Sequence, residues 1–308
     1  MRVVTWNLWW RFGPWRERQK AVLAVLRELD PDVIGLQEVW AAGADNLAEW
    51  LAGELGLYCT WAPSPAPGRW RERIADPAGP GADPVDIGKA VLSRWPVVEQ
   101  ETLLLPAPAD LADGRAALYA RVAAPAFDIP VFTTHLTSRP HASAVRRAQV
   151  GALAELVARH RDGTPFPPVV TGDFNAGPDS AELRRLGGTH GTPAVPGLVL
   201  HDTWALPWTG SGPPTTPRRG TDRARGHLEF REPLCDGPAG GGAARIDHIR
   251  VGPPGPAGEG RVQGVRRAGH GRTSWRGTRR SPEQAVTSEG DRSDVPSRAV
   301  NSRAQSGS

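Results

Sequence analysis

Short apolar runs alternate with helical patterns from residue 1 to about residue 251, and this alternation restricts the fold more than any other feature of the chain. Apolar runs bounded by turn residues predict strands at residues 3–8, 33–36, 87–92, 97–105, 116–123, 129–134, 169–171 and 246–251. Helical spacing predicts helices at residues 14–29, 44–55 and 142–160. Because several strands are apolar on both faces, we expect an α/β protein in which helices cover the sheets.

The last part of the chain has a different composition. After Ile249 the sequence contains no Leu, Ile, Phe or Met. Such a segment cannot bury enough apolar surface to offset the entropy of ordering it. We therefore predict a domain over residues 1–252 and an Arg/Gly/Ser/Pro-rich tail over residues 253–308, disordered from about residue 267 onward. Residues 63–86 and 207–244 are rich in Gly and Pro and predict two long loops.

The tail also accounts for the basic charge of the chain. The formal net charge is +4, and residues 261–308 hold ten arginines and four acids, so they carry +6 and leave about −2 on the rest. A nucleic-acid partner stays open, but the charge of the body gives it no support, because binding to a phosphate backbone needs a basic surface.

Cysteine usage and hydropathy restrict the cellular setting. Cys59 and Cys235 lie too far apart to indicate a disulfide framework or a zinc site. No apolar run reaches the roughly 20 residues that span a bilayer, and residues 1–6 read as a strand rather than a signal peptide. We expect a cytoplasmic monomer without a transmembrane segment.

Five short clusters place polar side chains where an apolar run ends, and loops at strand ends are where rigid scaffolds present catalytic groups. The clusters are Thr5-Trp6-Asn7, Leu36-Gln37-Glu38-Val39, Thr134-His135-Leu136, Thr171-Gly172-Asp173-Phe174-Asn175 and Arg245-Ile246-Asp247-His248-Ile249. A single cluster of this kind would be a weak signal, whereas five in order make a chance match improbable.

In order and spacing the clusters resemble the endonuclease/exonuclease/phosphatase superfamily of DNase I-like metal-dependent phosphoesterases. The resemblance covers residues 1 to about 251 and includes a strand near residues 88–94, in which Lys89 replaces the more usual Asn, and residues 146–149. It implies a four-layer α/β sandwich, in which two mixed β-sheets pack face to face with helices outside. It also implies a hydrolase whose substrate is a phosphodiester or a phosphomonoester.

The chemistry of phosphate esters explains the first two candidate residues. Mg²⁺ prefers oxygen ligands, typically one or two carboxylates with waters and the substrate phosphate, and it neutralises charge that develops during hydrolysis. We expect Glu38 to be the direct ligand of Mg²⁺, with Mn²⁺ as an alternative. Asn7 is expected either to contact the metal through water or to orient Glu38.

The resemblance also implies roles for four catalytic residues. His135 would donate a hydrogen bond to the scissile phosphate, and Asn175 would bind a phosphate oxygen. Asp173 would orient or activate the attacking water. Asp247 matches the family aspartate that pairs with a histidine near the C-terminus. Asp202, in a segment where relatives often have Asp-Thr-Trp, is interpreted as mainly structural.

The sequence departs from the family where the motif Ser-Asp-His and a final apolar strand should follow. The nearest remnants are Ser281-Pro282-Glu283 and Ser293-Asp294, and His270 lies in a different context. Two explanations compete. A shifted reading frame in a GC-rich gene would give an Arg-rich, Leu-free tail, and we favour it over genuine divergence with loss of the dyad. In either case we expect the last strand to be missing.

Two functions follow from these observations. The first is a Mg²⁺-dependent phosphoesterase acting on nucleic acid, a phosphoinositide or a phospholipid head group. The second is a catalytically impaired relative that keeps the metal and phosphate pocket but lacks the terminal Asp-His. The N-terminal tryptophans at positions 6, 9, 10 and 15 favour core packing over a lipid-binding or base-stacking surface.

Overall fold

The computed structural model describes residues 1–64, 85–111, 114–188, 192–206, 228–233 and 247–268. Most of the two predicted loops, residues 63–86 and 207–244, lies outside these ranges. So do the tail beyond residue 268 and the motif remnants at Ser281, Asp294 and His270. Among the described residues, no helix is long and apolar enough to cross a membrane.

The first sheet, sheet A, is mixed and has the strand order β13-β11-β1-β2-β5-β4, with the two-residue strand β3 paired to β2. Strand β1 runs parallel to β2 and β11, whereas β2, β5 and β4 are successively antiparallel. Its strands are β1 (Arg2–Asn7), β2 (Val33–Ala42), β3 (Asp45–Asn46), β4 (Tyr58–Pro63), β5 (Val85–Ser93), β11 (Leu228–Pro233) and β13 (Val262–Ala268).

The second sheet, sheet B, has the order β10-β12-β9-β8-β7-β6. Only β8 and β9 are parallel, and their other neighbours run antiparallel to them. The strands are β6 (Val97–Leu104), β7 (Ala116–Ala123), β8 (Asp128–His135), β9 (Val169–Asp173), β10 (His201–Asp202) and β12 (Asp247–Val251). The antiparallel direction of β12 brings its first residue to the edge at which β8 and β9 end.

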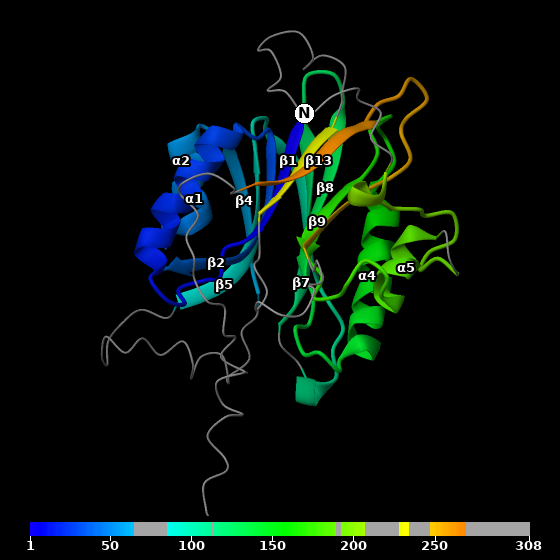
Figure 1. The fold of residues 1–308 in the computed structure, drawn as a ribbon, viewed down its shortest axis with the longest axis horizontal. Helices are drawn as coiled ribbons and strands as arrows, with labels where there is room; N and C mark the ends of the chain where they lie inside the picture. Colours follow the sequence, from blue (N-terminus) through cyan, green and yellow to red (C-terminus); the bar gives the residue numbers. More distant parts are fainter. Residues whose placement is uncertain (65–84, 112–113, 189–191, 207–227, 234–246, 269–308) are drawn as a thin grey trace, which may run out of the picture.

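Helices form the two outer layers (Figure 1). Helices α1 (Trp15–Leu29) and α2 (Leu47–Leu55) pack on sheet A, and α4 (Ser143–His160) and α5 (Ala181–Gly187) pack on sheet B. The short 3-10 helices η1 (Ala109–Leu111) and η2 (Thr203–Ala205) lie in connections. The four-layer α/β sandwich predicted from the family resemblance is confirmed.

Three apolar clusters hold the layers together, one under each pair of helices and one between the sheets. The sheets approach so closely that a Cβ atom on Gly35 would clash with the Thr171 hydroxyl. Trp10 and Trp40 are buried in the cluster beneath α1 and α2, and Trp6 and Trp15 pack against it. The tryptophan-rich N-terminal segment therefore contributes to a core, as its sequence favoured.

Several elements differ from the prediction. Strand β2 extends to Ala42 rather than ending near Leu36, because its C-terminal half pairs with β5 and β3. Strands β4, β10, β11 and β13 and helix α5 were not predicted. Strand β11 lies inside the segment predicted as the loop 207–244. Ladder hydrogen bonds come from the backbone, so a strand can form without an apolar run when a neighbouring edge accepts it.

The described chain also continues beyond the predicted domain end at residue 252. Gly252 donates its backbone N–H to the Pro168 carbonyl at 3.0 Å, and β13 then pairs with β11 in parallel. Residues 253–268 are therefore part of the folded unit rather than of the tail. From the departure of the sequence from the family pattern we expected the last strand to be missing. In the structure, sheet A carries the strand β13 after β12.

Candidate active site

Three predicted residues form a row across one edge of sheet B. In the register of the strands, His135 at the end of β8 is the partner of Asp173 at the end of β9. Asp173 is in turn the partner of Asp247, the first residue of β12. Directly paired residues project to the same face of a sheet. All three side chains are buried, so sheet B presents an imidazole and two carboxyl groups side by side.

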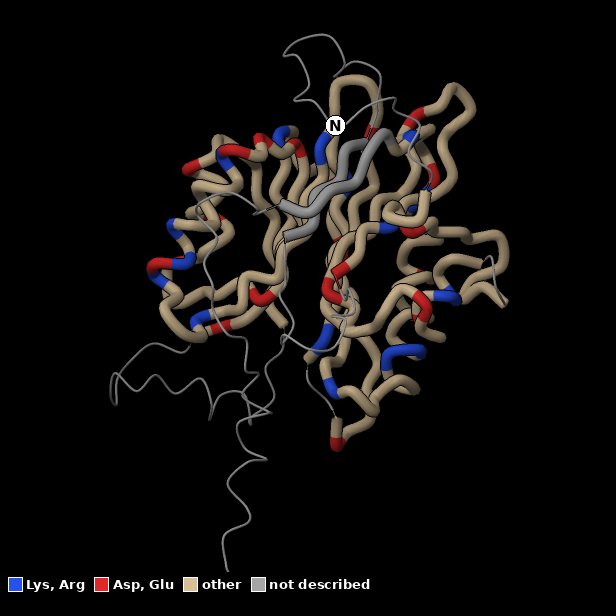
Figure 2. The backbone as a smooth tube through the Cα atoms, in the orientation of Figure 1, with Lys and Arg blue, Asp and Glu red and all other residues tan. Residues whose placement is uncertain are grey.

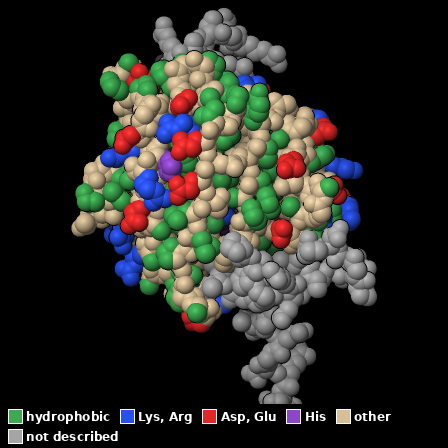
Figure 3. All heavy atoms as spheres, turned by 180° about the vertical axis from the view of Figure 1, so that it is seen from behind, with side chains coloured by type: hydrophobic (Ala, Val, Ile, Leu, Met, Phe, Trp, Pro, Cys, Tyr) green, Lys and Arg blue, Asp and Glu red, His purple; other side chains and the backbone are tan. Residues whose placement is uncertain are grey.

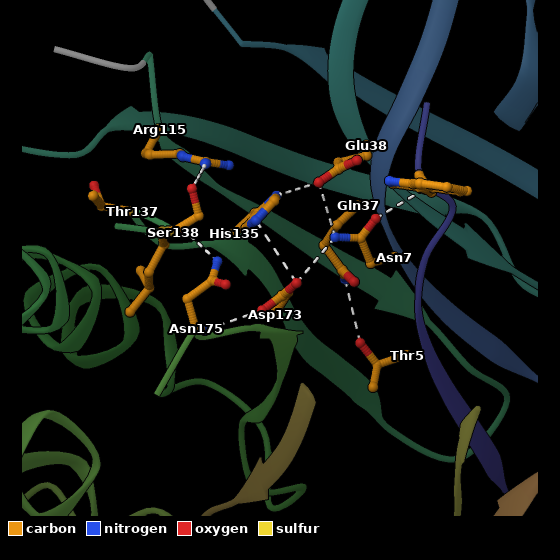
Figure 4. Close-up of polar contacts among 12 residues, drawn as sticks. Thr5, Asn7, Gln37, Glu38, Arg115, His135, Thr137, Ser138, Asp173 and Asn175 are labelled. Atoms are coloured by element: carbon orange, nitrogen blue, oxygen red, sulfur yellow. Dashed lines mark hydrogen bonds and ion pairs between the residues drawn. The ribbon is translucent and has the colours of Figure 1, made fainter. Parts of the chain in front are cut away.

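Sheet A supplies a facing pair from β1 and β2. Asn7 ends β1 and is the partner of Gln37 in β2. The register between β2 and β5 shifts between Gln37 and Val39, so Glu38 is the extra residue of a β-bulge. Glu38 has a φ of 51°, in the left-handed region that non-glycine residues rarely adopt. A bulge re-aims a side chain, and here it turns the Glu38 carboxylate toward sheet B (Figure 4).

The Asn7 amide joins the two sheets (Figure 4). Its Nδ2 donates to Glu38 Oε1 at 3.1 Å and to Asp173 Oδ2 at 3.0 Å. Its Oδ1 accepts the backbone N–H of Trp9 at 2.9 Å, which fixes which end of the amide faces the carboxylates. Asn7 thus holds two carboxylates in place as a donor. This geometry supports the orienting role for Asn7 over a role as metal ligand.

The His135 ring lies between the same two carboxylates. Its Nδ1 is 3.8 Å from Glu38 Oε1, and its Nε2 is 3.7 Å from Asp173 Oδ2. Both distances exceed a hydrogen bond, so the ring is close to each carboxylate without being bonded to either. The predicted residues Asn7, Glu38, His135 and Asp173 therefore form one compact cluster.

Asn175 follows Asp173 through a tight turn. Its backbone N–H donates to Asp173 Oδ1 at 3.0 Å, and its Nδ2 donates to the Leu136 carbonyl at 3.0 Å. Its φ of 47° is again left-handed. Strained residues held by several contacts are typical of functional sites. The turn places Asn175 on the side of His135 away from Glu38 (Figure 4).

Comparisons of the whole chain with known proteins establish its family. A model of the endonuclease/exonuclease/phosphatase family matches residues 4–253. The chain belongs to this family. Members of the endonuclease/exonuclease/phosphatase superfamily are phosphoesterases, so the chain falls among the hydrolases.

Relatives of this family extend the comparison. Protein angel of Drosophila melanogaster is 30% identical over 185 residues, which are 58% of this chain and 49% of the fly protein. The chain thus spans about half the length of this curated relative. Human Nocturnin's catalytic domain, solved with a bound sulfate anion, has a TM-score of 0.55 and 21% identity over 80% of this chain and 81% of that domain.

A mannosyl-6-phosphatase of Bacteroides thetaiotaomicron has a TM-score of 0.54 and 16% identity over 82% of this chain and 85% of that one. At these identities the solved structures establish a shared fold. The family membership itself rests on the match over residues 4–253.

Two elements outside the cluster hold its loops. Arg18 of α1 is buried and donates to the carbonyls of Leu8, Trp9, Trp10 and Phe12, which fixes the turn after Asn7. In α4, Gln149 accepts the Thr137 N–H at 3.0 Å and donates to the Thr137 hydroxyl at 2.9 Å. The family feature at residues 146–149 thus anchors the loop that follows His135.

A polar layer supports the cluster from below. Gln37 is fully buried, and its Nε2 donates to Thr5 Oγ1 at 3.2 Å and to Thr133 Oγ1 at 2.9 Å. Thr133 belongs to β8, so this amide crosses from sheet A to sheet B directly beneath Glu38 and His135. Asp202 lies apart in β10, where it caps η2 through the Trp204 N–H, in keeping with a structural role.

The donor set fits the Mg²⁺ that the family implies. Among the described residues, no three His, Cys, Asp or Glu side chains form a cage for a metal ion. Mg²⁺ does not need such a cage, because it is usually bound by one or two carboxylates with waters and substrate oxygens. The Glu38 carboxylate, oriented by Asn7 and with a side chain 17% exposed, meets this requirement.

One buried residue beside the cluster was noticed in the sequence only as a departure from the family. Lys89 in β5 is the register partner of Gln37, and it is 1% exposed. Burial, and then the charge of Arg115, lower the pKa of Lys89 to about 7. A lysine inside the apolar run 87–92 was the available signal, although its partners could not be read from the sequence.

Proposed function

We propose that the chain is a Mg²⁺-dependent phosphoesterase whose ion is held by Glu38. The observation that carries this proposal is the Asn7 amide bonded at once to Glu38 and Asp173, 3.1 Å and 3.0 Å away. It links a metal-binding carboxylate on sheet A to a base on sheet B. When bound, Mg²⁺ would act as a Lewis acid that neutralises charge on the phosphate and the leaving oxygen.

Asp173 is suited to orient the attacking water and to take up its proton. Its Oδ1 is committed to the Asn175 N–H, and its Oδ2 accepts from Asn7 while lying next to His135. These contacts fix the plane of the carboxylate before substrate arrives, and a preorganised group costs no reorganisation during reaction.

His135 and Asn175 would bind the phosphate. Both lie at the ends of strands of sheet B, and each is fixed by contacts that do not involve substrate. A ring N–H of His135 and the second N–H of the Asn175 amide are the donors for phosphate oxygens. Hydrogen bonds to an anionic oxygen are stronger than those between neutral groups.

Asp247 would orient the histidine of the family dyad. It lies opposite Asp173 in the β9–β12 pair, but the sequence lacks the Ser-Asp-His motif whose histidine would be its dyad partner. Loss of a general acid-base histidine costs roughly 10²- to 10⁴-fold in rate. We therefore expect slow turnover.

The same absence favours the second candidate, a relative that binds metal and phosphate without turnover. The substrate class stays open between nucleic acid, a phosphoinositide and a phospholipid head group. Acidic and basic residues are interspersed along the helices (Figure 2), and charges of both signs occur on the rear face (Figure 3). Over the described residues, neither view shows the one-signed basic surface that a DNA backbone needs.

Hydrolysis of bis-p-nitrophenyl phosphate with and without Mg²⁺ tests the proposal. We expect metal-dependent turnover that is abolished in Glu38→Ala and retained in Glu49→Ala, an exposed glutamate of α2. No turnover by a folded sample would favour the binding-only candidate. Turnover that is independent of metal, or that survives Glu38→Ala, would refute the assignment of Glu38.

A further inference from the structure

His248 is a fully buried histidine that the proposed reaction does not use. It follows Asp247 in β12, and successive residues of a strand project to opposite faces of a sheet. Since Asp247 belongs to the row of the candidate site, His248 faces the helix layer on the other side of sheet B. The centroid of its ring is 5.7 Å from that of Phe174, which belongs to the apolar cluster beneath α4 and α5. His248 therefore cannot replace the dyad histidine of Asp247.

The His248 ring is hydrogen-bonded to the segment that follows Asn175. Its Nε2 is 2.9 Å from the carbonyl oxygen of Ala176. A carbonyl only accepts, so Nε2 carries a proton and donates it. Ala176 is itself buried, and a buried carbonyl that loses its donor costs free energy. The ring N–H thus ties the backbone one residue after Asn175 to strand β12.

The turn from Asp173 to Ala176 lies between two surroundings. Asp173 and Asn175 reach the candidate site (Figure 4), whereas Phe174 and Ala176 are buried in the cluster beneath the helices. Asn175 has a left-handed φ of 47°, and such a residue persists only where its surroundings hold it. Asp173 Oδ1 accepts the N–H of Asn175 from the site, and His248 donates to the Ala176 carbonyl from the helix side. The two hydrogen bonds fix the backbone on either side of the Asn175 amide.

The second nitrogen of the His248 ring faces a carboxylate. Nδ1 lies 3.8 Å from Asp202 Oδ2, which is beyond a hydrogen bond. The other Asp202 oxygen accepts the Trp204 N–H at 3.1 Å. We expect Asp202→Asn, which keeps an oxygen for that N–H, to disturb the turn less than loss of the ring N–H of His248.

We propose that His248 is a positioning residue, which holds the turn from Asp173 to Ala176 and thereby presents the Asn175 amide to a phosphate oxygen. The inference rests on the proposed function, because it takes Asn175 to bind the phosphate. Neighbouring residues of one polar cluster of the sequence thus act on the two faces of sheet B. Asp247 belongs to the site, and His248 supports a loop of the site from behind.

Backbone ¹⁵N relaxation tests the hold on the turn without metal, substrate or turnover. In His248→Phe a ring remains but its donor is lost. We expect the order parameter of the Asn175 N–H to fall from about 0.85, typical of a rigid backbone, toward about 0.6. The value for Thr171, in the middle of β9, should not change. His248→Gln supplies an N–H at a similar reach and should restore the value for Asn175.

Ile249→Ala is the matched control for this measurement. Ile249 is the next residue of β12, but it points away from the turn, into the apolar cluster between the sheets. Its truncation lowers stability and should leave the Asn175 order parameter as in the unchanged chain. An Asn175 value that His248→Phe does not lower would overturn the proposal, and so would an equal fall at Thr171.

Binding of inorganic phosphate in the presence of Mg²⁺, measured by calorimetry, tests whether the turn matters for the anion. We expect about tenfold weaker binding in His248→Phe, through loss of one hydrogen bond, and normal binding in His248→Gln. Because His248 acts through Asn175, the same change should weaken binding no further in an Asn175→Ala background. Additive effects would contradict the inference. If the unchanged chain binds no phosphate, the proposed function fails, and the order parameters still decide whether His248 holds the turn.

Discussion

The two ends of the space between the sheets differ in chemistry along strands β1, β2, β8, β9 and β12. One end is lined by valines, the middle by threonines, Gly35 and Ile249, and the other by the residues of the candidate site. Along the inward face the successive residues are Val3, Thr5 and Asn7; Val33, Gly35 and Gln37; Val131, Thr133 and His135; Val169, Thr171 and Asp173; and Val251, Ile249 and Asp247.

This arrangement places the residues that stabilise the fold and the polar residues of the candidate site at different ends of one core. The apolar end stabilises the sandwich by burying Val3, Val33 and Val169 away from water. The polar end buries Asn7, Gln37 and Asp173, which is tolerable only because most of their polar atoms find partners. We infer that changes at one end alter stability and that changes at the other alter activity.

The largest effect should come from Asp173→Asn at the polar end. The amide cannot take up a proton from water, so we expect kcat to fall about 10²- to 10⁴-fold. The melting temperature should fall modestly, because the amide keeps only one of the two hydrogen bonds that the Asp173 oxygens accept from Asn175 N–H and Asn7 Nδ2. Mg²⁺-dependent hydrolysis of bis-p-nitrophenyl phosphate and thermal denaturation measure the two quantities.

Asp162→Asn is the matched control for this change, since the Asp162 side chain is 86% exposed and remote from the cluster. It should leave both activity and stability unaltered. An Asp173→Asn protein that hydrolyses the substrate as fast as the unchanged chain would remove Asp173 from the mechanism.

Ile249→Ala should show the opposite pattern, because Ile249 is the apolar residue of the middle row. Ile249 is fully buried between the sheets, and its truncation leaves a cavity. We expect a loss of about 2–5 kcal/mol in the free energy of unfolding, measured by urea denaturation. Turnover per folded molecule should persist. The same truncation at Val98, which is 60% exposed on β6, should cost far less. Loss of activity in a folded Ile249→Ala protein would break the comparison.

A smaller effect is expected from Thr133→Val in the middle layer. The change removes the hydroxyl that accepts from Gln37 Nε2, while Thr5 and Gly35 still accept from that amide. We expect a loss of about 0.5–1.5 kcal/mol in unfolding free energy. A modest fall in kcat should accompany it, because Gln37 supports the Glu38 bulge. Thr102→Val, at an exposed position of β6, is the control. If Thr133→Val lowered kcat as much as Asp173→Asn does, the predicted order of effects would be wrong.

Much of this arrangement could be predicted from the sequence. The apolar runs at residues 116–123 and 169–171 predicted β7 and the core of β9, because both faces of these strands are buried. The polar clusters predicted which residues meet, since each cluster ends a strand and the strand ends meet at one edge. The family resemblance supplied the two mixed sheets, which periodicity alone does not specify.

Other features depend on tertiary pairing and carry no local signal. The bulge at Glu38 exists only in the register between β2 and β5. The use of the Asn7 amide as a donor to two carboxylates follows from the Trp9 N–H that occupies its oxygen. The presence of a strand beyond residue 252 depends on the pairing of β13 with β11. Lys89 could be seen in the sequence, but its burial and its hydrogen bond to the Ser64 hydroxyl could not.

The assignment of Glu38 as the metal ligand is the central claim, and binding of Mn²⁺ measured by electron paramagnetic resonance tests it most directly without requiring turnover. We predict one tightly bound ion per chain, displaced by Mg²⁺, with affinity at least about tenfold weaker in Glu38→Gln and unchanged in Glu49→Gln. Equal Mn²⁺ affinity in the unchanged chain and in Glu38→Gln would contradict the account.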